Sequence, residues 1–128
     1  MPAPGFLHAS LLVAFGGGTG AWLRFVAGRL VPSAQFPWAT FSVNLLGSLA
    51  MGLLAGWLLR GGQASETWRL ALGVGLLGGF TTFSAFSLEL VQLAQRDQWL
   101  SAALYASLSL AGGVAGLLAG LALARTFA

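Results

Sequence analysis

Long apolar stretches separated by short connections dominate the hydropathy pattern of this chain. Four of these stretches reach the roughly 20 residues that an α-helix needs to cross the hydrocarbon of a bilayer. They lie at about residues 6–28, 38–59, 68–94 and 99–123. The pattern predicts an all-α membrane protein in which residues 1–128 form a single domain of four transmembrane helices.

The third stretch contains a segment, residues 78–87, that is polar but carries no charge. It includes a glycine pair and a threonine pair, which weaken a helix through backbone freedom and side-chain crowding. In lipid, non-helical backbone is tolerated only where it is buried in protein or lines a cavity. We therefore expect a break in the third helix over residues 78–82. Broken helices at the bilayer midplane commonly form ion sites.

Polar and small residues recur every four positions along the second stretch, which places them on one face of a helix. They are Thr40, Asn44, Ser48, Gly52 and Gly56. The two glycines form a helix-packing motif. An amide in hydrocarbon is costly unless it is hydrogen-bonded, so we expect Asn44 either to line a pore or to bond a neighbouring helix.

The fourth stretch repeats this order of polar residues followed by glycines. Its hydroxyls belong to Ser101, Tyr105 and Ser109, and the glycines that follow are Gly112, Gly116 and Gly120. Glycines at this spacing favour close packing of helices. The hydroxyls can bond back to their own helix, or they can form a hydrogen-bonding track together with the polar face of the second stretch.

Four more side chains each allow two interpretations. Phe83 and Phe86 share a helical face and either pack in the core or present their positive ring edges to an anion. Arg24 either extends to the interface or holds anions at a pore mouth. Glu89 is either an interfacial carboxylate or part of a pore vestibule.

Composition narrows the classes of function. Apolar residues make up 57% of the chain, and there are no cysteines, which excludes disulfides and thiolate metal sites. One histidine and three scattered acids form no convergent set for acid–base catalysis, so we do not expect an enzyme. The net charge of +3 comes from arginines spread along the chain, which gives no basic patch for nucleic acid.

The arginines also bear on topology, because membrane orientation follows the Lys and Arg content of short loops. One side would carry Arg60, Arg69 and Arg125, and the other Arg24, Arg29 and Arg96. A chain without bias can insert both ways and pair as an antiparallel, dual-topology homodimer with a twofold axis in the membrane plane. If the helix break lies on that axis, its freed carbonyls converge and attract a hard cation such as Na⁺.

Three motifs in this order resemble the CrcB (Fluc) fluoride channels of bacteria. They are GGGTGAWLR at 16–24, TFSVNLLG at 40–47 and GGFTTFSAFSLE at 78–89. The resemblance covers essentially the whole chain. It implies a dual-topology dimer in the bacterial cytoplasmic (inner) membrane that exports toxic fluoride passively through two pores, with a central structural Na⁺.

The resemblance also implies roles for individual residues. Asn44 would line the pore, while Phe83 and Phe86 would present ring edges to fluoride. The backbone carbonyls of Gly78 and Thr81 from each subunit would hold the Na⁺. The remaining implied positions are Arg24 and Glu89 at the pore ends and, along the fluoride pathway, Thr40, Thr82, Ser84, Tyr105 and Ser109. A serine expected one turn after Ser109 is Gly113 in this chain, which leaves the far end of that track open.

Fluoride suits these side chains, because a tightly hydrated anion needs hydrogen-bond donors that do not trap it on a fixed charge. A small multidrug-type dual-topology transporter is the nearest alternative, but it needs a carboxylate in the first helix, and residues 6–28 contain none. A membrane assembly subunit would explain the glycines but neither the polar break nor the hydroxyl stripes.

Overall fold

The computed structural model describes residues 2–61 and 65–127 of the chain, so residues 1, 62–64 and 128 of the predicted domain lie outside the described residues. Its elements, in chain order, are α1 (Phe6–Leu30), α2 (Trp38–Leu58), α3 (Ser65–Trp68), the π-helix η1 (Arg69–Leu77), α4 (Gly78–Phe80), α5 (Ser84–Gln95) and α6 (Trp99–Thr126). Four stretches are long and apolar enough to span a membrane, namely Phe6–Leu30, Trp38–Leu58, Ser65–Gln95 and Trp99–Thr126. The prediction of four apolar spans is confirmed.

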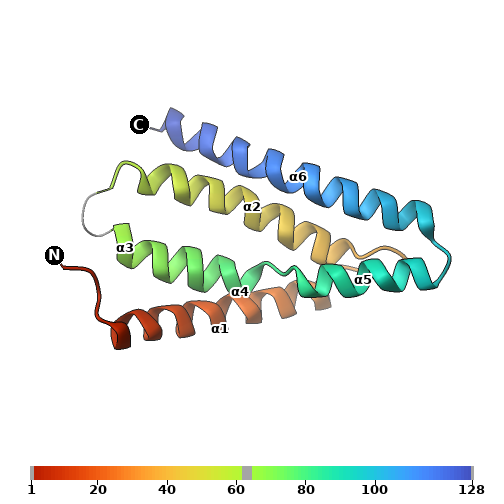
Figure 1. Ribbon diagram of the computed structural model, residues 1–128, viewed down its shortest axis with the longest axis horizontal. Helices are drawn as coiled ribbons and strands as arrows, with labels where there is room; N and C mark the ends of the chain where they lie inside the picture. The colour runs from red at the N-terminus through yellow and green to blue at the C-terminus, as the bar shows by residue number, and fades with distance from the viewer. Residues whose placement is uncertain (1, 62–64, 128) are drawn as a thin grey trace.

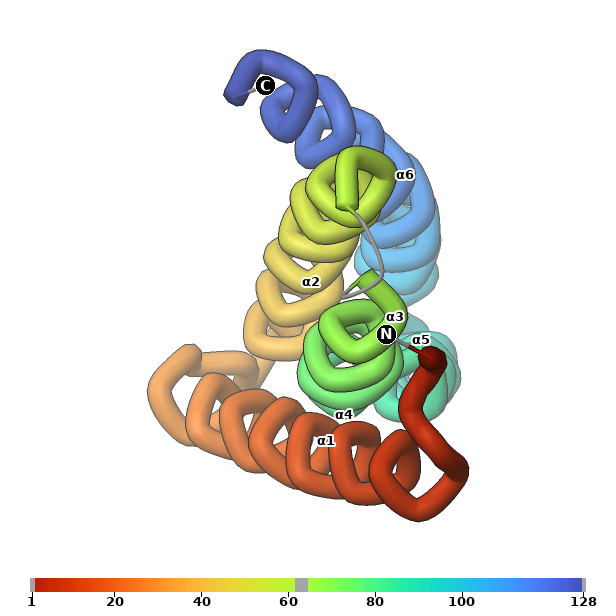
Figure 2. The backbone as a smooth tube through the Cα atoms, turned by 90° about the vertical axis from the view of Figure 1, so that its left-hand side faces the viewer, coloured from red at the N-terminus to blue at the C-terminus, as the bar shows by residue number. Residues whose placement is uncertain are grey.

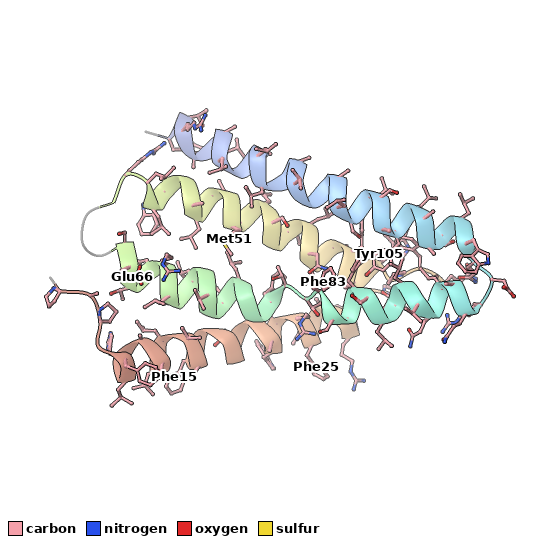
Figure 3. The ribbon with its side chains drawn as sticks, in the orientation of Figure 1. Phe15, Phe25, Met51, Glu66, Phe83 and Tyr105 are labelled. Atoms are coloured by element: carbon pink, nitrogen blue, oxygen red, sulfur yellow. The ribbon has the colours of Figure 1, made fainter. Side chains whose placement is uncertain are left out.

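The four spans lie alongside one another, with α2 between α6 and the third span, and with α1 on the far side of the third span (Figure 1). The start of α1, the ends of α2 and α6, and α3 lie at one end of the bundle. Seen along the bundle, α1 and α6 lie at opposite edges (Figure 2). Phe15 and Phe25 on α1 point away from the other helices (Figure 3) and are 75% and 58% exposed, as expected for side chains that meet lipid.

Helices α2 and α6 run in the same direction and pack through glycines near their carboxyl ends. A methyl group at Gly52 would overlap the carbonyl oxygen of Leu117, and one at Gly120 would overlap that of Leu49. The two backbones therefore touch without intervening side chains, which is the contact that small residues spaced by four permit. This contact fixes the register of α2 against α6 along their whole length.

Helix α1 packs against η1 and α4 in the same manner. A side chain at Gly20 would overlap the carbonyl oxygen of Leu76, and one at Gly79 would overlap the backbone of Gly17. The glycine run of the first motif is therefore a helix-packing surface in this structure. A π-helix at this place was not predicted, because hydrophobic periodicity alone does not distinguish it from an α-helix.

The third span loses its helical backbone for three residues. The helix continues through Gly78 to Phe80, and Thr81 N donates to the Leu77 carbonyl at 3.0 Å. Thr81 then turns to an extended conformation, with φ −83° and ψ 157°, and α5 begins at Ser84. The non-helical residues are thus 81–83, whereas the expected range was 78–82. Both glycines stay helical, and Gly17 of α1 packs directly on the backbone of Gly79.

Candidate functional site

Asn44 replaces the missing helical partner at the interruption. The Thr82 N–H, which would donate to the Gly78 carbonyl in a continuous helix, donates to Asn44 Oδ1 at 2.8 Å. In return Asn44 Nδ2 donates to the Thr82 carbonyl at 2.9 Å. Both atoms of the amide are therefore engaged by the backbone of one residue on another span. This is the inter-helix bond that the sequence left as one of two interpretations, and one amide N–H remains for another partner.

A second donor is diverted at the start of α5. The Ala85 N–H, which would donate to the Thr81 carbonyl in a continuous helix, donates to the hydroxyl of Thr82 at 3.1 Å. The carbonyls of Gly78 and Thr81 thus both lose their helical donors, one to a side chain on α2 and the other to the neighbouring threonine. Carbonyl oxygens freed in this way are ligands suited to a hard cation.

Arg24 lies beside this interruption. Its Nε donates to the Gly79 carbonyl at 3.3 Å, so the guanidinium is held within the bundle by a backbone group of the third span. The arginine supplies a positive charge next to the non-helical residues.

The polar faces of α2 and α6 stand opposite each other in register. At the first level, Thr40 Oγ1 and the Tyr105 hydroxyl donate to the two oxygens of Glu89, each at 2.7 Å. One turn further along each helix are Asn44 and Ser109, which line the same hollow. The two hydroxyl stripes therefore form a shared polar track, with the carboxylate of α5 bridging them at one end.

The track opens on two hollows. A larger one of about 530 Å³, named the polar hollow below, is lined by Asn44, Gly47, Ser48, Met51, Gly78, Thr81, Thr82, Phe83, Phe86, Ser109, Leu110 and Leu117. A smaller one of about 220 Å³ includes Thr40, Glu89, Gln92 and Arg96. Tyr105 is completely buried. Glu89 lines the smaller hollow, and Tyr105 lines neither hollow but contacts Phe86, which lines the larger one.

The two phenylalanines of the third motif line the polar hollow in different ways. Their ring centroids are 5.8 Å apart with planes at 41°, and Phe86 also meets Tyr105 in a T-shaped contact at 4.9 Å. Phe86 packs against the buried cluster around Tyr105, whereas Phe83 is 80% exposed. Figure 3 shows Phe83 near the interruption, on the side that faces α2. One ring is thus fixed by its neighbours and the other is largely free.

The structure brings together most of the residues singled out in the sequence, with two differences. Ser84 is exposed and does not line the polar hollow, although its hydroxyl lies 3.4 Å from that of Thr82. Sequence reasoning also missed Phe36, which lies in the connection before α2. Its ring packs edge-on against the ring of Tyr105, and the two ring centroids are 5.3 Å apart. An aromatic residue between polar loop residues and a proline was the available signal.

These features define a multi-pass membrane protein whose third span is interrupted beside an uncharged polar hollow. Residues 11–121 match the family described as CrcB-like protein, Camphor Resistance (CrcB). The chain belongs to this family.

Curated relatives are similar over nearly their full length. A protein of Novosphingobium aromaticivorans named fluoride-specific ion channel FluC is 58% identical over 93% of this chain and 98% of its own length. Proteins with the same name from Hyphomonas neptunium and Erythrobacter litoralis are 52% and 48% identical, over 93% and 95% of this chain and 97% and 96% of their own lengths.

Proposed function

We propose that this protein is a fluoride-selective ion channel that lets cytoplasmic fluoride leave the cell passively and so protects against fluoride toxicity. Membership of the family and the names of the relatives support the choice of ion. The polar hollow supports an anion path, because amide and hydroxyl donors line it together with two phenyl rings, and none of its lining residues is charged. Such a surface can replace the water around a small anion without binding it too tightly.

The observation that carries the proposal is the hydroxyl of Ser109. Its oxygen is buried and has no hydrogen-bond partner within residues 2–61 and 65–127. Leaving a buried polar group unpaired costs about 1–3 kcal/mol, so the site favours a ligand that accepts a hydrogen bond from it. An anion in the polar hollow is such a ligand, and fluoride is the strongest acceptor among the halides.

The remaining contacts suggest an order along the path. Phe83 and Phe86 would present ring edges to fluoride in the polar hollow, where the free amide N–H of Asn44 and the Thr82 hydroxyl add donors. Ser84 would join them from the exposed side. The first level, where Thr40 and Tyr105 already donate to Glu89, would pass the ion to the smaller hollow, with Glu89 at one pore end and Arg24 at the other.

The proposal includes an antiparallel homodimer that inserts in both orientations, with two pores. The non-helical residues 81–83 and the exposed Ser84 beside them are a polar surface that lipid does not cover well, and a second copy is the simplest cover. The equal division of arginines between the two sides supports dual topology. The membrane would be the cytoplasmic (inner) membrane of a bacterium.

A structural Na⁺ fits the carbonyls of Gly78 and Thr81. Both carbonyls have lost their helical donors, and Gly78 is exposed where a partner copy can approach. Two oxygens are too few to replace the hydration shell of a cation, so the matching pair from the second subunit would have to complete the site. The ion would neutralise four inward-pointing carbonyl dipoles and hold the two interruptions together.

Fluoride efflux from liposomes tests the proposal. The purified protein should release fluoride and retain chloride, as read by ion-selective electrodes. Phe83→Ile should suppress the flux, because it keeps an apolar side chain and removes the ring edge. Phe15→Ile, the same change on a ring that points away from the bundle, should conduct like the parent. Folded dimers without fluoride flux would overturn the channel assignment in favour of a transporter or assembly subunit.

A further inference from the structure

We infer that Ser48 of α2 is an additional ligand of the permeating anion, donating its hydroxyl at the level where α6 has only Gly113. The inference rests on the proposed channel function and adds a residue to the same path. It concerns the third level of the track, one turn beyond Asn44 on α2 and one turn beyond Ser109 on α6.

Ser48 differs from most helical hydroxyls of this protein in its hydrogen bonding. Within helices, a serine or threonine in lipid commonly donates to the carbonyl four residues before it. Ser10, Thr19, Thr81 and Ser87 all do so, at 2.7–2.9 Å. In the described part of the chain, Ser48 makes no such bond, and neither does Ser109.

The location of Ser48 also sets it apart. Several hydroxyls lack that bond, but within residues 2–61 and 65–127 only those of Ser48, Thr82 and Ser109 also line the polar hollow. The Thr82 hydroxyl is already engaged, because it accepts from the Ala85 N–H. Ser48 follows Asn44 by four residues, so its donor lies about 6 Å further along the helix axis. That distance is a practical step for an anion passing from one donor to the next.

The hydroxyl of Ser48 also has open space beside it. A methyl group at Gly113 would lie 3.5 Å from Ser48 Oγ, so the glycine leaves the position next to this oxygen open. A side chain on Gly112, one residue before, would meet only the Leu45 side chain, and one on Gly116, three residues after, would lie 3.5–3.9 Å from Leu45, Leu49 and the Cβ of Ser48. The helices are thus in contact on either side, and the opening at Gly113 faces Ser48. At this level α2 has to supply the donor, since α6 cannot.

The chemistry suits the role. A hydroxyl donates one hydrogen bond and carries no charge, so it can hold fluoride briefly and release it. Because the two helices are parallel and in register, a hydroxyl from either one can reach the same space. This interchangeability gives the inference a sharp test.

The test uses fluoride efflux from liposomes containing the full-length protein. Ser48→Ala should slow efflux about tenfold, the effect of one lost hydrogen bond on a barrier. Adding Gly113→Ser to Ser48→Ala should restore much of the flux, because it returns a hydroxyl from the opposite helix. Ser42→Ala, the same change on α2 outside the polar hollow, should conduct like the parent.

The outcomes separate this inference from the proposed function. If the parent conducts fluoride and Ser48→Ala conducts equally well, Ser48 is not a ligand, although the channel assignment stands. If Ser48→Ala is slow and Gly113→Ser restores nothing, the serine acts through packing and the inference is overturned. Should Ser48→Ala fold poorly by size-exclusion chromatography, Ser48→Cys replaces it, since a thiol of similar size is a weak donor. A parent without flux would overturn the proposed function itself.

Discussion

The two halves of the α2–α6 pair use the same four-residue spacing in opposite ways. One half leaves a hollow between the helices, and the other brings their backbones into contact. In the half near the interruption, positions four apart carry Asn44 on one helix and Tyr105 and Ser109 on the other, and a hollow opens beside them. In the other half, Gly52 and Gly120 let the backbones touch. Direct backbone contact tolerates no shift in register, so the glycine half sets the alignment that the polar half needs. An open, donor-lined hollow thus depends on a closed contact elsewhere in the same helix pair.

The largest expected effect is a loss of stability when a side chain is added in the half where the two backbones touch. Gly120→Ala should destabilise the protein by at least about 1–3 kcal/mol, because the added methyl overlaps backbone atoms of Leu49 and Leu53 that cannot rotate away. Thermal unfolding in detergent, followed by size-exclusion chromatography, measures this. Gly116→Ala is the matched control, since its methyl would lie 3.5 Å from the nearest atom, the Leu45 carbonyl oxygen. Equal stability of the two variants would show that glycine contact does not set the register.

A smaller effect is expected in the polar half, where Asn44→Ala and Ser109→Ala should differ. Asn44→Ala leaves the N–H and carbonyl of Thr82 without partners, so we expect lower thermal stability together with reduced fluoride flux. Ser109→Ala removes a buried hydroxyl that already lacks a partner, so flux should fall while stability is unchanged or higher. If Asn44→Ala lost flux alone, its bonds to Thr82 would be dispensable and pore lining would be its main role.

The smallest effect lies outside both halves. Glu66 and Arg69 form an exposed ion pair, with Arg69 Nε 2.8 Å from Glu66 Oε2. Exposed pairs of this kind contribute little to stability, so Glu66→Gln should leave both the unfolding temperature and fluoride flux unchanged. The same two assays used for the helix pair give the comparison. A clear loss of stability would assign this end of the third span a structural role that its contacts do not suggest.

The spans were predictable from sequence because apolar length is sufficient evidence for a membrane helix. The exact position of the interruption was not. Two glycines favour non-helical backbone in isolation, yet Gly78 and Gly79 remain helical, with Gly17 of α1 packed against the backbone of Gly79. Local propensity therefore located the region, and a contact between distant segments moved the non-helical residues to 81–83.

For the candidate site, too, the sequence located the residues but not their contacts. Spacing placed Asn44 and Thr40 on one helical face, but it could not show that they bond different elements, Thr82 at the interruption and Glu89 on α5. Periodicity gives the face of a helix and says nothing about how the neighbouring helix is rotated. The open choice between pore lining and inter-helix bonding at Asn44 required those contacts.

The π-helix has a consequence for chain length. Over Arg69–Leu77 the helical hydrogen bonds join residues five apart rather than four. Each hydrogen-bonded turn therefore contains one more residue than a turn of α-helix. A deletion of one residue there can be absorbed by reverting to ordinary α-helical bonds, whereas a deletion in α5 would rotate every residue behind it. A deletion of one residue in η1 can therefore be tolerated upstream of the interruption while the residues beyond it keep their orientation.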